Sequence, residues 1–289
     1  MAMPSDIGII DLMMAIPNDE KSNFYDFIKP LLMDEESRQM FQMPAQYMFK
    51  DVPNTGKQDD YLQYTIDKMD EFGIEKAMIG VDEGMYASQN EAVEKYPERF
   101  YGSYECNPNN GMEEVRKIRR LKEKYDIKAV TAFPSGLCPQ VSLSDKRWYP
   151  IFVTCIDLNI PFCPCVGVPG PRIPMEPQKV EHLDEICWFF PELKVVMRHG
   201  AEPWTDLAWK LMLKYPNLYY MTSAFAPKHY PQNIVNFANT RGADKVMYAG
   251  YFPMGLSFER IFKDMPNVPF KDEVWPKFLR ENAERVFKL

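Results

Sequence analysis

The chain has 289 residues, enough for one large domain or two small ones, and enough to build a core without disulfides or a structural metal. Apolar residues make up 46% and charged residues 26%, which are globular proportions that exclude long disordered segments. The net charge of −7, with no basic cluster and no apolar run long enough for a membrane span, argues against nucleic acid or a membrane as partner.

Short apolar, β-favouring segments alternate along the chain with segments of 3.6-residue periodicity. The first kind predicts eight strands, at Ile7–Met14, Lys76–Asp82, Tyr101–Cys106, Ile127–Phe133, Ile160–Val166, Lys194–His199, Leu218–Ser223 and Val246–Tyr251. The second kind predicts helices at Tyr61–Phe72, Ser88–Lys95, Gly111–Lys124, Lys146–Leu158, Val180–Phe189, Thr205–Lys214, Pro231–Asn239, Leu256–Phe262 and Asp272–Phe287. Prolines at 97, 191 and 216 end helices just before a strand, because the residue before proline avoids helical geometry.

Strands that alternate with helices predict an α/β fold, and eight of them in one chain predict a closed (β/α)8 TIM barrel, with residues 1–289 forming a single domain. A doubly wound open sheet is the alternative, but it usually has fewer strands and a glycine-rich loop after the first, which is missing at Asp11–Ala15. Residues 18–57 form an insertion after the first strand. It is either a lid over the barrel mouth or a surface excursion.

The six cysteines lack the CxxC or Cys/His spacing of a zinc site. The start of the chain also does not resemble a signal peptide. We therefore predict reduced thiols and a cytoplasmic protein.

Polar residues at the carboxyl ends of the strands usually carry the chemistry of such a barrel. At the predicted ends stand Asp11, Asp82–Glu83, Tyr104–Cys106, Cys165, Arg198–Gly200, Thr222–Ser223 and Tyr251. This set contains acids, a base, a cation and a phenol, but it lacks the His, Asp and Glu density of a metal site.

Short motifs at strand spacing carry a family resemblance. They are Ile9–Asp11, Ile160–Pro161, Pro191–Gly200, Pro216–Tyr219, Lys245–Pro253 and Glu281–Phe287. Together they resemble the amidohydrolase superfamily over nearly the whole chain, in the amidohydrolase-related (type 2) branch that includes aminocarboxymuconate-semialdehyde decarboxylase. The resemblance implies a TIM barrel whose members often bind a divalent metal.

Most metal-ligand positions of that family are occupied here by other residues. The resemblance places the HxH pair of the first strand at Leu12 and Met14, the histidine of the fifth at Cys165 and the aspartate of the eighth at Tyr251. Only the histidine of the sixth strand remains, as His199. Since a divalent ion needs three or more donors, we expect no catalytic metal and no cofactor.

Two other metal sites stay open as alternatives. The soft donors Met14 and Cys165 suit a copper(I)-like ion. A new set formed by His199, Glu83 and Asp11 is the second alternative.

Without a Lewis acid, a carbonyl must be polarised by positive charge and hydrogen-bond donors. We expect His199 to act as a general base or acid near neutral pH, with Asp11 or Glu83 orienting it or taking over the proton. Tyr251 is expected to line the pocket, as a hydrogen-bond donor or as a plain wall. Arg172, in the rigid turn after the fifth strand, is expected to hold a substrate carboxylate. Arg198 is expected to face the helical layer, because its neighbour on the strand is placed in the lumen.

Further substrate contacts are expected from Cys165, Glu83, Tyr104, Ser223 and Met14. Cys165 is either a nucleophile paired with the strand-six histidine or a small buried thiol. Two residues after the seventh strand, at 228 and 229, are either substrate contacts or exposed loop residues.

These features predict a metal-independent hydrolase acting on a small cyclic or aromatic carboxylic acid, ester or lactone. The preference for hydrolysis comes from the family resemblance. The alternatives are a decarboxylase-like carbon–carbon lyase acting on an aromatic acid and a non-catalytic, small-molecule-binding barrel with its mouth plugged by Leu12, Met14 and Tyr251. The expected partners are a small-molecule substrate and further copies of the chain in a homo-oligomer.

Overall fold

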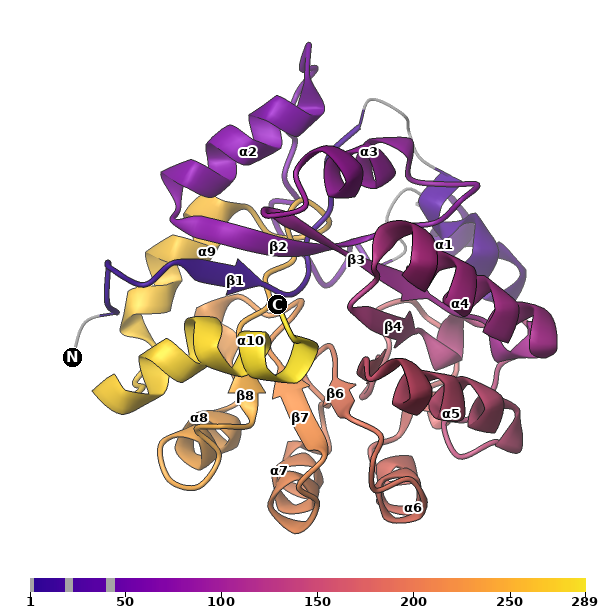
Figure 1. The fold of residues 1–289 in the computed structure, drawn as a ribbon. Coiled ribbons are helices and arrows are strands. Elements are labelled where there is room, and N and C mark those ends of the chain that lie inside the picture. Colours follow the sequence, from indigo (N-terminus) through magenta and orange to yellow (C-terminus); the bar gives the residue numbers. More distant parts are fainter. Residues whose placement is uncertain (1–2, 19–22, 40–44) are drawn as a thin grey trace.

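The predicted barrel is confirmed by the computed structural model, which describes residues 3–18, 23–39 and 45–289 (Figure 1). Within these ranges, eight parallel strands pair in chain order, each with the next. The strands are β1 (Ile9–Asp11), β2 (Ile74–Gly80), β3 (Phe100–Glu105), β4 (Ala129–Ala132), β5 (Phe162–Pro164), β6 (Val195–Met197), β7 (Leu218–Met221) and β8 (Val246–Met247).

Helices surround the sheet on its outer face (Figure 1). The described α-helices are α1 (Glu35–Gln39), α2 (Tyr61–Glu71), α3 (Ala87–Lys95), α4 (Met112–Tyr125), α5 (Tyr149–Leu158), α6 (His182–Phe189), α7 (Thr205–Lys214), α8 (Gln232–Ala238), α9 (Phe258–Asp264) and α10 (Asn282–Phe287). In α4, for example, Val115, Ile118 and Leu121 are buried at three-residue spacing while the opposite face is charged. In the described residues, no helix has the length and apolar character needed to cross a membrane.

Several elements end earlier than the sequence predicts. β6 stops at Met197 because His199 adopts a left-handed backbone conformation, with φ at 63°. β8 spans only Val246–Met247. The long helix expected over residues 272–287 is divided into a 3-10 turn, a π-helical segment at Lys277–Glu281 and α10.

The seam between β8 and β1 is joined by a side chain. Asp11, which is fully buried, accepts a hydrogen bond at Oδ1 from the Gly250 N–H at 2.8 Å and another from the Met13 N–H at 2.9 Å. Burial raises the pKa of this carboxyl to about 6. Asp11 therefore links the first strand to the segment that follows the last one.

The lower part of the barrel lumen is filled by apolar side chains from the inner faces of the strands. Successive side chains on a strand point to opposite faces, and one face contributes Ile10, Met78, Ala129, Cys163, Val196, Met221 and Met247 to a single buried cluster. Ala283, Val286 and Phe287 of α10 join this cluster and close the amino end of the barrel. The position of α10 is fixed further by Lys194, which precedes β6 and donates from Nζ to the Val286 carbonyl.

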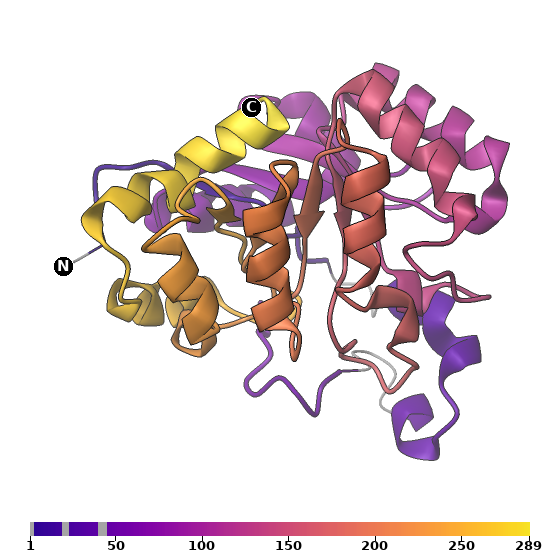
Figure 2. The ribbon, with the colours of Figure 1, turned by 90° about the horizontal axis from the view of Figure 1, so that it is seen from below.

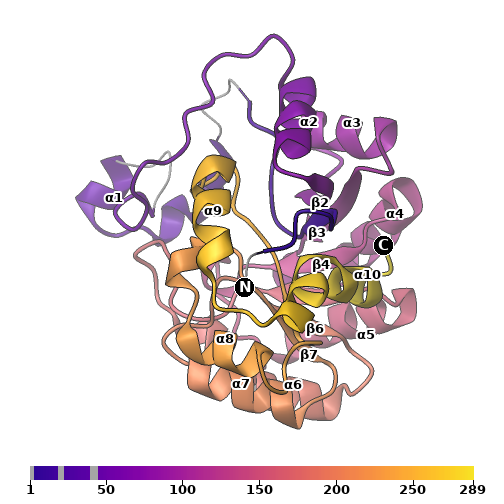
Figure 3. The same cartoon turned by 90° about the vertical axis from the view of Figure 1, so that its left-hand side faces the viewer.

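The insertion after β1 lies at the opposite end of the barrel from α10 (Figures 2 and 3). Its described part contains the 3-10 helix η1 (Asn23–Leu31) and α1. The Tyr47 hydroxyl donates a hydrogen bond to the Gly170 carbonyl at 2.6 Å. Nη1 of Arg260 donates a hydrogen bond to the Lys50 carbonyl at 2.8 Å. The insertion thus contacts the loop after β5 and helix α9, both of which follow carboxyl ends of strands.

Candidate active site

A cavity of about 750 Å³ lies at the carboxyl ends of the strands. A smaller hollow of about 90 Å³ adjoins it and shares Met13, Glu105, Arg198 and Met254 with it. Strand ends, the loops after β5 and β7, and the insertion all contribute to the walls of the larger cavity. This is the end of a TIM barrel at which active sites are built.

The two-residue period of the strands carries three polar side chains into this cavity. Val196 and Cys163 lie in the apolar lumen cluster, so Arg198 and Cys165, two residues further on, face the lumen one layer higher. Glu105, at the end of β3, reaches the same space. The expectation that Arg198 faces the helical layer is therefore wrong.

Arg198 is a buried cation with few partners. Its side chain is 7% exposed, and its Nη1 lies 3.7 Å from Oε2 of Glu105. Its Nη2 lies 3.7 Å from the Met13 sulfur, and its Nε is buried without a hydrogen-bond partner among the described residues. A guanidinium carries five N–H donors, so Arg198 has donor capacity left for an anionic ligand in the cavity.

His199 lines the cavity as expected, but it is not poised to transfer protons at neutral pH. Its backbone N–H donates to Ser223 Oγ at 3.1 Å, and the same oxygen lies 3.2 Å from Nδ1. Burial, together with the adjacent Arg198 charge, lowers the pKa of His199 to about 3. The imidazole is therefore neutral and weakly basic at pH 7, and Ser223 positions it from behind.

The ionisation of the two neighbouring acids also follows from burial. The Glu105 side chain is 42% exposed, but it lies inside the cavity, where partial desolvation raises its pKa and the Arg198 charge opposes part of the rise. Burial raises the pKa of Cys165 to about 12, again opposed by Arg198. Cys165 is therefore a buried thiol rather than an activated nucleophile, while Glu105 holds its proton more firmly than an exposed glutamate does.

Aromatic side chains form one wall of the cavity. Tyr251 continues the inner-face period of β8 and lies in the wall as expected. Its ring stacks on Phe49 at 5.6 Å and meets His199 edge-on at 5.5 Å. Tyr25 of η1 hydrogen-bonds with Tyr251, and burial raises the pKa of Tyr25 to about 12. The insertion thereby supplies side chains to the site itself.

Six residues predicted for the site do not line the larger cavity: Asp11, Met14, Glu83, Tyr104, Arg172 and Ser223. Tyr104 points under α4, where its hydroxyl donates to Glu114 at 2.7 Å. Glu83 is on the surface, 3.7 Å from Nε of Arg120. Asp11 is sealed into the seam described above. Each of these three side chains is directed away from the cavity by the packing of its own strand or loop.

Arg172 also lies outside the larger cavity. It donates from Nη1 to Asp34 at 3.0 Å and to Glu36 at 2.8 Å, and its guanidinium lies over the ring of Tyr47. The predicted carboxylate clamp is thus already occupied by acids of the insertion, which it holds against the loop after β5. Met14 lines only the smaller hollow.

Sequence reasoning missed Glu105 and Tyr25 as cavity residues and placed Arg198 on the wrong face. The predicted end of the third strand contained Glu105, but its neighbour Tyr104 was chosen instead. Lys228 and His229 are exposed loop residues that also line the cavity.

The side chains present do not fit a divalent metal ion. In residues 3–18, 23–39 and 45–289, no three His, Cys, Asp or Glu side chains are grouped so as to hold one. Glu83 and Asp11 do not meet His199, and Met14 and Cys165 line different hollows, so neither alternative donor set is assembled. The Arg198 cation would also repel a dication in the same space.

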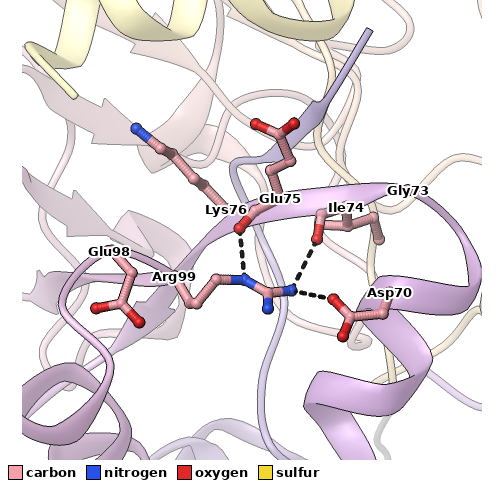
Figure 4. A pocket seen from close by; sticks show the side chains of 7 residues that line it. All are labelled: Asp70, Gly73, Ile74, Glu75, Lys76, Glu98 and Arg99. Atoms are coloured by element: carbon pink, nitrogen blue, oxygen red, sulfur yellow. Dashed lines mark hydrogen bonds and ion pairs between the residues drawn. The ribbon is translucent and has the colours of Figure 1, made fainter. Parts of the chain in front are cut away.

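A shallow hollow near the amino ends of β2 and β3 offers no comparable chemistry (Figure 4). Arg99 crosses it and donates to Asp70 at 2.6 Å and to the carbonyls of Glu75 and Ile74. These groups satisfy one another, so the hollow is a structural contact between α2 and the two strands.

Comparisons with known proteins agree with the barrel fold. The model of a family described as amidohydrolase matches residues 37–289. An uncharacterized TIM-barrel protein from Bordetella bronchiseptica is similar in structure, with a TM-score of 0.72 and 21% identity over 97% of this chain and 98% of that one. No curated protein matches the sequence.

Two solved decarboxylases are also similar. One is 5-carboxyvanillate decarboxylase from Novosphingobium aromaticivorans, complexed with manganese and 4-hydroxy-3-methoxy-5-nitrobenzoic acid, with a TM-score of 0.68 and 17% identity over 98% of this chain and 97% of that one. The other is 2,6-dihydroxybenzoate decarboxylase from Rhizobium, with a TM-score of 0.67 and 14% identity over 98% and 99%. Because such neighbours are mostly decarboxylases, which are lyases, the preference for hydrolysis is wrong and the alternative of a lyase is the better supported one.

Proposed function

The chain belongs to the amidohydrolase family, and we propose on that premise that it is a carbon–carbon lyase that releases a carboxyl group of an aromatic acid as CO2. The observation that carries the proposal is Arg198, a buried guanidinium with unused donors that faces an aromatic-walled cavity. A planar, fork-shaped cation of this kind pairs with a carboxylate, or with a carboxylate and a neighbouring phenol oxygen, in two-pronged geometry.

The proton needed for decarboxylation is assigned to Glu105. A ring carbon that loses CO2 must first gain a proton, after which the electrons of the breaking C–C bond restore the aromatic ring. Glu105 lies beside Arg198 in the cavity, and partial desolvation there raises its pKa. His199 is unsuited to this step because its lowered pKa of about 3 leaves no proton to donate at neutral pH.

The walls around these two residues favour departure of CO2. Met13, Phe133 and Leu256 line the cavity with apolar surface. A carboxylate bound there loses its water, while neutral CO2 does not need any, so the apolar wall disfavours the charged reactant more than the product. Arg198 holds the substrate carboxylate in place. The apolar wall lowers the free energy needed to convert this carboxylate into neutral CO2.

The proposal assigns no step to a metal ion, because the donor set described above does not fit one. The manganese of the 5-carboxyvanillate decarboxylase is a property of that protein. In this chain the cationic part of the site is assigned to Arg198.

The proposal is tested by assaying hydroxylated and methoxylated benzoic acids for CO2 release and for the shortened aromatic product. In D2O, one deuterium is expected on the carbon that carried the carboxyl group. Activity is expected to persist after treatment with a chelator and to fall by at least 100-fold in Arg198→Gln. The surface variant Arg172→Gln is the matched control, with turnover expected within threefold of wild type.

Three outcomes contradict this assignment. Release of an alcohol or amine without CO2 identifies a hydrolytic reaction. Activity that appears only after addition of Mn²⁺ contradicts the proposal that the reaction is independent of a metal ion. Unchanged turnover in Arg198→Gln shows that the guanidinium does not hold the reacting acid.

A further inference from the structure

We propose that the substrate carries a second anionic group, bound at the rim of the cavity by Lys50, Lys228 and Arg260 while the first sits on Arg198. This inference rests on the proposed function and narrows its substrate class to extended aromatic dianions. The three rim cations belong to the insertion, to the 3-10 turn after β7 (Pro227–His229) and to α9, and all line the cavity.

The charge of the cavity contrasts with that of the whole chain. The net charge of the protein is −7, yet the described Lys, Arg, Asp and Glu residues that line the cavity are four Lys and Arg and two Glu. The two acids are Glu105 and Glu202. A cationic hollow in an anionic protein concentrates anions at its mouth.

Among the described residues, the rim cations have no acidic partner. In the part of the chain that the structure describes, Lys50, Lys228 and Arg260 form no ion pair with a carboxylate, although Arg260 donates to the Lys50 carbonyl. Arg172, an exposed arginine beside the same mouth, is neutralised by two acids. The rim cations therefore stay available for an external anion.

Depth separates the two anion sites. Arg198 is almost completely buried at the floor of the cavity, whereas Lys50 and Lys228 are exposed at its edge. The cavity of about 750 Å³ falls in the range of about 300–1,000 Å³ that holds drug-sized ligands. A cavity of this volume has room for a scaffold larger than one ring, and the proposal places one acid group at the floor and one at the rim.

The test compares two ligands of the same shape, naphthalene-2,6-dicarboxylate and naphthalene-2-carboxylate, by calorimetric titration of the full chain. The dicarboxylate is expected to bind at least tenfold more tightly at low salt. In the double variant Lys228→Gln/Arg260→Gln, this preference is expected to fall below threefold, while the affinity for the monocarboxylate changes by less than threefold. Since exposed charges are screened, the preference of the wild type also shrinks as NaCl is raised.

Controls separate this inference from the proposed function. Arg172→Gln is expected to keep the full preference, because its charge is already paired. Arg198→Gln is expected to lower the affinity for both ligands. Unchanged affinities in this variant count against the proposed function. Equal affinity of the two ligands for the wild type, or an unchanged preference in the double variant, overturns the inference while leaving the role of Arg198 intact.

Discussion

The two ends of the barrel lumen have opposite chemistry, although the same strands build both. At the amino end, inner-face residues such as Val196 and Cys163 form one apolar cluster with Val286 and Phe287 of α10. Two residues further along β6, the inner face carries Arg198 beside the cavity. Along β6, two residues therefore separate the tightly packed apolar region of the lumen from the region that contains an incompletely paired charge.

This difference assigns stability to one end and binding to the other. The apolar end gains free energy from burial and close packing. The other end holds a charge out of water with few partners, which costs stability and is retained where a ligand completes the pairing. Each of the following substitutions is chosen to change one end without the other.

The largest effect is expected from Phe287→Ala at the plugged end. Phe287 is 2% exposed and packs in the lumen cluster, so its removal leaves a cavity. Such truncations cost about 3–5 kcal/mol, which urea unfolding would measure as a lower midpoint with unchanged slope. Ligand affinity of the folded fraction is expected to stay within threefold. A loss of affinity as large as the loss of stability would break the proposed division between the two ends.

The next effect is expected from Glu105→Gln at the open end. If Glu105 is the proton donor, the amide cannot replace it, and general-acid catalysis of this kind contributes about 10²–10⁴-fold. In wild type, activity should fall as pH rises through the elevated pKa of Glu105, because only the protonated acid donates. The variant should lose at least 100-fold in kcat together with this pH limb. An unchanged pH profile would assign the proton to another group.

The sequence could predict the order and kind of the elements but not which way each strand faces. In a parallel barrel, both faces of a strand are buried, and Val195, Val196 and Met197 are apolar without alternation. The inner face of β6 could therefore not be identified, and Arg198 was assigned outward. The same ambiguity led to the choice of Tyr104 instead of Glu105.

The insertion shows a second limit of sequence reasoning. The exposed turn after β5 suggested that Arg172 binds substrate, but its partners Asp34 and Glu36 are more than 130 positions away in the chain. Long-range pairs of this kind leave no periodic signal. Tyr25 likewise enters the site from a segment without a strand, so only the folded arrangement brings it to Tyr251.

A smaller effect, and of opposite sign to the truncation of Phe287, is expected from Arg198→Met. Replacing a whole buried ion pair with apolar side chains is often neutral or stabilising by about 1–4 kcal/mol, and removing one partner is costly only when the other charge stays buried. The partner here, Glu105, lies 3.7 Å from Arg198 with its side chain 42% exposed, so its charge stays partly solvated after the substitution. The melting temperature should therefore hold or rise by a few degrees while turnover is lost. A melting temperature that falls by more than a few degrees would show that Arg198 is a structural residue of the barrel and weaken the contrast between the two ends.

The smallest effect is expected from Arg172→Gln, which sharpens the comparison by testing the insertion that covers the open end. The exposed ion pairs of Arg172 with Asp34 and Glu36 contribute at most about 1 kcal/mol. Their loss should leave the unfolding midpoint nearly unchanged. It should speed proteolytic cleavage or amide exchange within residues 23–39, and both effects should be mimicked in wild type by high salt. Since Arg172 lies outside the cavity, kcat should stay within threefold. A large drop in kcat would return Arg172 to the role of a direct substrate contact, whereas faster exchange at unchanged kcat would show that the insertion is held over the mouth by charges that take no part in the reaction.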